Sequence, residues 1–497
     1  MITLKHKESV MENFETNTTS GIKDSGHPKE SYHLRGNMGT IELLFTVLAF
    51  TAPLGVIYGY LSYNFAFGIA VPLAFIVVAC FILLFALGFT RMSRSIPRPG
   101  AFYTYIATGL GKKVGLGGAY LAVASYAFNL MSTIVFSGII VNNFITNFGG
   151  PADFPWWGGS AIMFLIVWFM SYFNVELSAK VLSTALVLEL IGILIFDFTI
   201  LKNTPAENFT LAPWKFDNLM TPSAGLMLLF GVGLFNGFEA TAIYRDEVKN
   251  PEKTIPRATY LTVILIGALY AISSYSMILS SGVDKIVDIA QKQPTSIMST
   301  AVSQNFGAIA SQIVAVLLMT SVFASMLSLQ NILSRYVHSL SVDGIFSKKL
   351  AKVHPKHGSP YCAALFTGAV ISAIAVFIAF SGFDSTLLYG AAAGLAFYGM
   401  LLLLLLTSFA VIRYFTVTNS NFSIFATRIA PAVSVLGFIY VVVTATLNID
   451  ILIPTSRDLG IILVALLYMT FAVGFYMAWS LKKKNAIIYK QIGRNTA

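Results

Sequence analysis

Long apolar stretches separated by short polar breaks fill most of the 497-residue chain. Each stretch is long enough to cross the ~30 Å hydrocarbon core of a bilayer as a helix. The stretches are continuous rather than alternating, which favours helices over the strands of a membrane barrel. The pattern therefore predicts an all-α integral membrane protein with about twelve transmembrane helices. The predicted spans lie near residues 40–64, 68–90, 115–147, 156–174, 179–201, 221–244, 258–281, 302–338, 361–381, 386–413, 425–448 and 459–481.

Basic residues are distributed unevenly over the polar breaks. If the N-terminus is placed in the cytoplasm, 27 of the 32 Lys and Arg residues fall on that side and five fall on the other. Lys and Arg concentrate in the cytoplasmic loops of membrane proteins. We therefore predict a multi-pass protein of the cell (inner) membrane with both termini in the cytoplasm. The five basic residues placed outside are Lys202, Lys215, Lys285, Lys292 and Arg457.

Composition agrees with a lipid environment. Hydrophobic residues make up 56% of the chain and charged residues 11%, whereas soluble proteins carry about 25% charged residues. The net charge of +10 is scattered over short loops, so no nucleic-acid-binding patch is expected. Cys80 and Cys362 lie in or beside apolar stretches, which argues against a disulfide framework. The chain shows no phosphate-binding loop, metal-ligand spacing or nucleophile–base constellation, and we predict no enzyme activity, cofactor or metal.

Two predicted spans are interrupted in the middle by Gly and Pro. They stand five spans apart, an arrangement that indicates an inverted-repeat transporter. A broken helix frees backbone groups that lipid cannot satisfy, so both breaks are predicted to face a substrate cavity, with Gly55 and Gly237 bordering the substrate. For either span alone, a simple kink or close packing is the alternative. The two segments are Ala52, Pro53, Leu54, Gly55 and Val56 in the first span, and Phe235, Asn236, Gly237, Phe238 and Glu239 in the sixth.

Three short motifs occur in order along these spans. Residues 98–105 fit the pattern P-x-x-G-x-x-Y-x-Y together with Pro97. Residues 237–256 fit G-[FV]-[ED]-A…E-x-x-N-P…I-P, and residues 331–360 contain N-x-x-x-R, Asp343-Gly344 and Pro360. With twelve spans, the chain resembles permeases of the amino acid–polyamine–organocation (APC) superfamily.

The resemblance implies a five-plus-five inverted-repeat fold with broken helices 1 and 6. It also implies a substrate site between these two helices, lined by the third, eighth and tenth spans. Among the lining candidates are Tyr126 of the third span and Ser325 of the eighth. The expected divisions are a disordered N-terminal tail at 1–38, repeats at 39–201 and 220–414, helices 11 and 12 at 424–482, and a C-terminal tail at 483–497.

The implied function is proton-coupled uptake of amino acids by alternating access. Amino-acid carriers of this superfamily hold the substrate carboxylate on N–H groups of a Gly-rich turn in the first helix. Here the turn contains Pro53, which has no N–H, so a polyamine or small-amine transporter or exchanger is the alternative. A nutrient sensor on the same fold is a further alternative. The expected partners are a small amino compound, protons and the lipid bilayer; the sequence does not fix the oligomeric state.

Four acidic residues fall within the predicted spans. Glu42 and Asp197 lie near span ends, where we expect them to be wetted. Glu239 follows the second break, and Glu189 lies deep in the fifth span, at a position where proton-coupled relatives carry a lysine. A carboxyl group in the membrane interior marks a functional site by default. Glu189 and Glu239 are therefore the predicted proton-coupling residues, with a permanently protonated, packed Glu as the alternative for Glu189.

Overall fold

The computed structural model describes residues 38–96, 101–151, 154–173, 179–418, 421–452 and 457–493. The predicted N-terminal tail therefore lies almost entirely outside the described residues. Regular structure in the described residues is helical, apart from one isolated bridge between Met38 and Val248. Eleven helices of this part are long and apolar enough to cross a membrane. The α-helices are α2 (Thr40–Thr51), α3 (Pro53–Val56), α4 (Ser62–Asn64), α5 (Val71–Ser95), α6 (Ala101–Leu110), α7 (Lys112–Asn147), α8 (Trp156–Phe173), α9 (Ala179–Asn203), α10 (Phe216–Leu219), α11 (Ala224–Leu234), α12 (Ala240–Ile243), α13 (Pro251–Ser281), α14 (Ile286–Lys292), α15 (Ser296–Val342), α16 (Tyr361–Ala379), α17 (Ser385–Val417), α18 (Ala430–Leu447), α19 (Ile449–Leu452), α20 (Arg457–Lys484) and α21 (Ala486–Gln491).

The helix count agrees with the predicted architecture. The first span is divided into α2 and α3, which continue through a π-helical turn at Ile57–Leu61. The sixth span is divided into α11 and α12 and is too short to count as one of the eleven long helices. Both predicted breaks are therefore confirmed, and the all-helical membrane class is confirmed with them.

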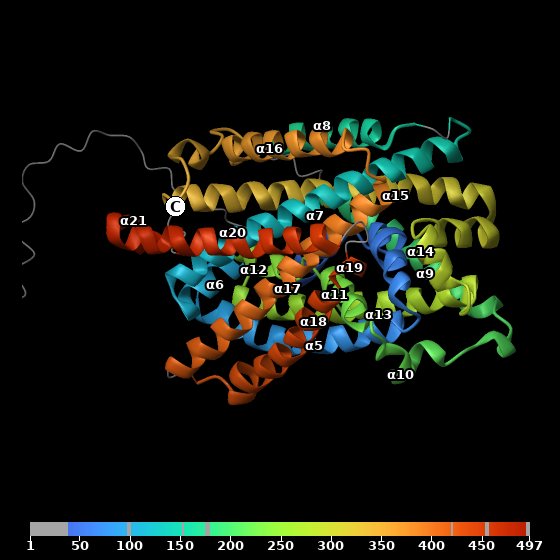
Figure 1. Cartoon of the computed structure of the whole chain (residues 1–497), viewed down its shortest axis with the longest axis horizontal. Helices are drawn as coiled ribbons and strands as arrows, with labels where there is room; N and C mark the ends of the chain where they lie inside the picture. The colour runs from blue at the N-terminus through green and yellow to red at the C-terminus, as the bar shows by residue number, and fades with distance from the viewer. Residues whose placement is uncertain are drawn as a thin grey trace, which may run out of the picture. The chain divides into compact units, whose positions relative to one another are not determined.

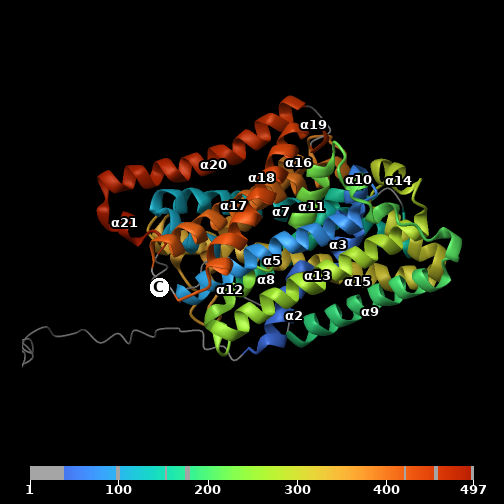
Figure 2. The same cartoon turned by 90° about the horizontal axis from the view of Figure 1, so that it is seen from below.

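The two ends of the helix bundle carry different loops. Figures 1 and 2 show α10 and α14 together at one end and α21 at the other. These are the segments that the basic residues place outside and inside, respectively. At the end with α21, the Lys112 ammonium donates to the Lys490 carbonyl and lies over the Tyr489 ring.

A buried polar cluster fastens the C-terminal segment to this end. Tyr103 of α6 donates to Asp343 Oδ2 at 2.6 Å, and the Gly493 N–H donates to Tyr103 Oη at 2.8 Å and to Asp343 Oδ2 at 3.2 Å. Burial and the neighbouring Asp343 carboxylate raise the pKa of Tyr103 well above its ordinary value. The phenol therefore stays protonated and remains the donor.

We expect Tyr103→Phe to lower the stability of the protein by about 1–3 kcal/mol, because it removes a donor to a buried carboxylate and an acceptor for the Gly493 N–H. The melting temperature of the purified protein measures the effect. Tyr120→Phe is the matched control, since Tyr120 donates to the weak acceptor Met477 Sδ and its loss should change little. Equal melting temperatures for Tyr103→Phe and the wild type would contradict the expectation.

The two broken spans pack against each other. The Lys249 N–H donates to the Met38 carbonyl at 2.9 Å, where the chain enters the first span and leaves the sixth. Behind this bond, Leu43 and Val47 of α2 form a small buried cluster with Ala240 of α12. The start of the first span and the end of the sixth are thereby held together, which places the two breaks side by side.

Candidate functional site

The first break begins at Ala52. Its backbone is left-handed (φ 46°, ψ 68°), and its N–H bonds back to the carbonyls of Leu48 and Ala49. A residue with a β-carbon pays roughly 1–2 kcal/mol for this conformation. Pro53 then starts α3, at a helix position where its missing N–H costs nothing. One helix thus ends at Ala52 and another begins at Pro53 within the first span, and the left-handed backbone of Ala52 is strained.

The second break depends on Gly237. Its φ of 116° is one that residues with side chains rarely adopt, and a β-carbon built there would lie 2.3 Å from Phe50 Cδ1 of α2. Gly55 is less constrained, because its nearest neighbour would be Val322 Cγ2 at 3.4 Å, an ordinary contact. Of the two glycines, only Gly237 has a backbone conformation and neighbours that require its missing side chain.

Glu239 accepts two hydrogen bonds at the second break, one from the turn itself and one from α7. Its Oε2 accepts the Gly237 N–H at 2.8 Å, and its Oε1 accepts the Tyr126 hydroxyl of α7 at 2.7 Å. The Tyr126 ring in turn packs on Tyr336 of α15, with 5.5 Å between centroids. Glu239 is 1% exposed. Both carboxyl oxygens therefore have donors, and the residue ties the broken helix to α7.

Glu189 is connected to the first break through α15. The Gly55 N–H donates to Ser321 Oγ at 3.2 Å, and Ser321 donates to Glu189 Oε2 at 2.8 Å. Glu189 is 4% exposed, and no Lys or Arg side chain among the described residues pairs with it. One hydroxyl thus joins a buried carboxyl group to the backbone of a broken helix.

A small cavity lies between the two breaks. Its volume is about 40 Å³, enough for a few water molecules at roughly 10–15 Å³ each. Asn236 contributes a buried side-chain oxygen without a hydrogen-bond partner in the described part of the chain. The lining residues come from both broken spans and from α7, α15 and α17: Phe50, Thr51, Val56, Tyr60, Asn129, Gly233, Leu234, Asn236, Ser325, Leu329 and Phe397.

A group of stacked aromatic rings borders the cavity. Tyr60 stacks on Tyr389 with 4.9 Å between centroids, and Phe136 stacks on the same ring at 4.9 Å. Phe397 meets Tyr60 edge-on at 5.2 Å. Tyr60 and Phe397 of this aromatic group line the cavity directly.

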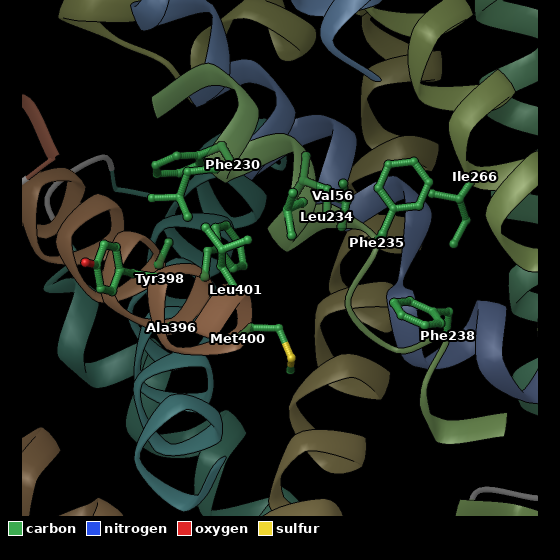
Figure 3. Packing of buried hydrophobic residues seen from close by; sticks show 14 of the residues in the cluster. Val56, Phe230, Leu234, Phe235, Phe238, Ile266, Ala396, Tyr398, Met400 and Leu401 are labelled. Atoms are coloured by element: carbon green, nitrogen blue, oxygen red, sulfur yellow. The ribbon is translucent and has the colours of Figure 1, made fainter. Parts of the chain in front are cut away.

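The predicted site residues do not all meet at this cavity. Val56, Asn236 and Ser325 line it. Ala52, Pro53 and Leu54 form the first break. The Gly55 N–H donates to Ser321, and the Tyr126 hydroxyl donates to Glu239. Phe235 and Phe238 lie elsewhere: the ring of Phe235 packs near Phe75 of α5, and that of Phe238 packs near Phe85. In Figure 3, Phe235 lies between Ile266 on one side and the neighbouring Val56 and Leu234 on the other.

Two polar residues of the spans escaped the sequence interpretation, and the environment of a third was predicted wrongly. Asn129 and Tyr60 line the cavity. For Asn129, a polar amide within the third apolar stretch was a signal that could have identified it. Asp197 is a correction, because it is not wetted: it is 3% exposed and accepts the Ser273 hydroxyl at 2.7 Å. Glu42, in contrast, is exposed and caps α2 through the Gly39 N–H at 2.7 Å.

Over the ranges that the structure describes, no three His, Cys, Asp or Glu side chains converge. The chemistry offered by the cavity is that of neutral donors and acceptors flanked by two carboxyl groups.

Comparison with known proteins identifies the family. The model of the amino acid permease family matches residues 42–488. The chain belongs to this family. Among relatives, this permease is similar to the branched-chain amino acid permease BcaP of Bacillus subtilis, with 25% identity over 61% of this chain and 66% of that protein. It is similar to the low-affinity putrescine importer PlaP of Escherichia coli, with 25% identity over 60% and 66%.

A third relative of the permease is the serine/threonine exchanger SteT of Bacillus subtilis, with 23% identity over 57% of this chain and 64% of that protein. The chain thus spans slightly less than two thirds of the length of these curated relatives. Their names include amino acids and putrescine, so family membership alone does not select a substrate.

Proposed function

We propose that this permease carries amino acids by alternating access, driven by protons, and that the alternative cargo is a polyamine or small amine. The observation that carries the proposal is the connection from the Gly55 N–H through Ser321 to Glu189. It places a buried carboxyl group one hydroxyl away from the backbone of a broken helix. A change at the substrate end can therefore alter the environment of the carboxyl group.

An ammonium group is common to both kinds of cargo. The unpartnered oxygen of Asn236 faces a cavity bordered by two helix breaks. Carbonyl dipoles at the C-terminal end of α11 favour a positive charge at this position. We place the substrate ammonium beside Asn236.

The carboxylate is what separates the two cargoes. Gly55 supplies a backbone donor at the first break, and that donor is held by Ser321 at 3.2 Å. A substrate carboxylate would compete with Ser321 for this N–H and free the serine hydroxyl. An amine without a carboxylate would leave the link intact. Amino-acid binding therefore has a direct route to Glu189 that amine binding lacks.

Proton coupling follows from the surroundings of Glu189. An ionised carboxylate buried without a cation is costly, whereas a protonated one is not. A rearrangement of the helices that lets water reach Glu189 would lower that cost. Glu189 would then release its proton in a wet, open state and bind it before closure, which is the behaviour that a coupling residue needs.

A ligand screen tests the proposed cargo. Each common amino acid is compared with the amine formed by its decarboxylation, and the melting temperature of the purified protein is recorded, because ligands of the folded state raise it. We expect one or more amino acids to raise the temperature and their decarboxylated partners to have no effect. The reverse order would establish the amine alternative. Absence of any shift would contradict both.

The side assignment predicts how loops label from outside. Single cysteines replace Lys215 and Lys285 at one end and Lys349 at the other, in a chain without Cys80 and Cys362. All three lysines are exposed. With a membrane-impermeant maleimide on intact cells, we expect labelling at positions 215 and 285 alone, because the basic residues place position 349 inside. Labelling at 349 without permeabilisation would overturn the map.

A further inference from the structure

A second and larger cavity lies on the other side of Glu189. Its volume is about 450 Å³, and it is lined by residues of α7, α8, α9 and α15 and by Ala49 of α2. Apart from Glu189 and Thr320, the side chains that line it are apolar. We call it the lateral pocket. It is separate from the small cavity between the breaks, with which it shares no lining residue.

The lateral pocket opens on the lipid-facing side of the bundle. Ile162 and Ile166 of α8 border it and are 61% and 49% exposed. Both residues lie inside a predicted membrane span, so their exposed surface faces hydrocarbon. A ligand would therefore enter the pocket from the membrane.

The polar chemistry of the pocket is limited to one acid and one hydroxyl. Thr320 donates its hydroxyl to the Leu317 carbonyl of its own helix at 2.7 Å. Glu189 lines the pocket while its Oε2 is bound to Ser321. A carboxylate in an apolar enclosure needs a cationic partner, and the described residues offer it none. The pocket thus combines a large apolar volume with a carboxyl group that, when ionised, has no cation to pair with among the described residues.

We propose that the lateral pocket binds hydrophobic amines that partition into the membrane, with the ammonium group paired to the Glu189 carboxylate. The volume falls within the 300–1,000 Å³ range of small-molecule sites, which are mostly apolar with few polar groups. A bound amine would keep Glu189 ionised and would block its protonation. Inhibition of coupled transport by such amines rests on the function proposed above, whereas their binding does not.

The test measures binding rather than transport. The full chain is placed in phosphatidylcholine nanodiscs and titrated calorimetrically with 4-phenylbutylamine and with 4-phenylbutan-1-ol, which has the same shape without the charge. We expect the amine to bind about tenfold more tightly than the alcohol, and Glu189→Gln to remove that difference. Ala185→Leu fills the pocket and should weaken both ligands. Asp197→Asn is the matched control, because Asp197 is a buried acid of the same helix that does not line the pocket.

Several results would overturn the proposal. Equal affinity for the amine and the alcohol would mean that the lateral pocket accommodates apolar chains without recognising the ammonium group. Unchanged amine affinity in Glu189→Gln, or in Ala185→Leu, would place the amine elsewhere. If Glu189→Gln loses proton coupling yet binds the amine like the wild type, this inference fails and the proposed function stands. If Glu189→Gln loses the preference for the amine but still couples transport to protons, this inference stands and the proposed function fails.

Discussion

Gly237→Ala is expected to reduce transport to the level of protein-free liposomes. The added β-carbon would lie 2.3 Å from Phe50 Cδ1, and the φ of 116° is strained for any residue with a side chain. Either the turn or α2 must move, and both carry the lining of the cavity. The backbone strain alone costs about 1–3 kcal/mol, so the variant should fold at reduced melting temperature. Uptake in reconstituted liposomes, scaled to the amount of folded protein, measures the effect.

Gly55→Ala is the matched control for this variant. It adds the same methyl group to the other break, but its nearest contact would be an ordinary 3.4 Å. We expect it to lose less transport than Gly237→Ala. Full transport by Gly237→Ala, or equal loss in both variants, would contradict the geometry of the second break.

Glu189→Gln is expected to abolish accumulation driven by a pH gradient while leaving substrate exchange in place. Glutamine keeps the shape of the side chain and its bond to Ser321, but it cannot lose a proton. The cycle then runs without its ion, so labelled substrate equilibrates but does not concentrate. Uptake against a gradient and counterflow exchange, recorded on the same liposomes, separate the two effects.

Asp197→Asn controls for the loss of a buried acid from α9. Asp197 is bound to Ser273 and has no contact with the first break, so its amide variant should still concentrate substrate. Accumulation by Glu189→Gln at the wild-type level would refute the coupling role of Glu189. Glu239 would then be the remaining candidate for proton coupling.

The fold was predictable because hydrocarbon imposes simple rules on a sequence. Length and apolarity set the spans, and lipid forbids loose backbone, so Gly and Pro at the centre of an apolar stretch indicated both breaks. The direction of side chains within a break was not predictable. Helical periodicity is lost there, so the sequence does not show which way these side chains point. Phe235 and Phe238 were expected at the cavity, whereas in the structure their rings pack near α5.

The site was predictable only in part. The placement of Glu189 deep in a span was visible, but its link to Gly55 joins residues far apart in the chain through a serine of α15. No local pattern encodes such a contact. Asp197 shows the same limit: its position near a span end predicted wetting, whereas packing of α13 against α9 buries it.

The central claim is that the substrate lies between the two breaks, and protection of Ser325→Cys tests it most directly. Ser325 lines the cavity from α15, and cysteine is close to serine in size. In a chain without Cys80 and Cys362, modification by a small methanethiosulfonate reagent is followed with and without the compound that most raises the melting temperature. The account predicts that this compound slows modification at saturating concentration and leaves a cysteine at position 285 unaffected. Equal modification rates with and without the compound would contradict the proposed site.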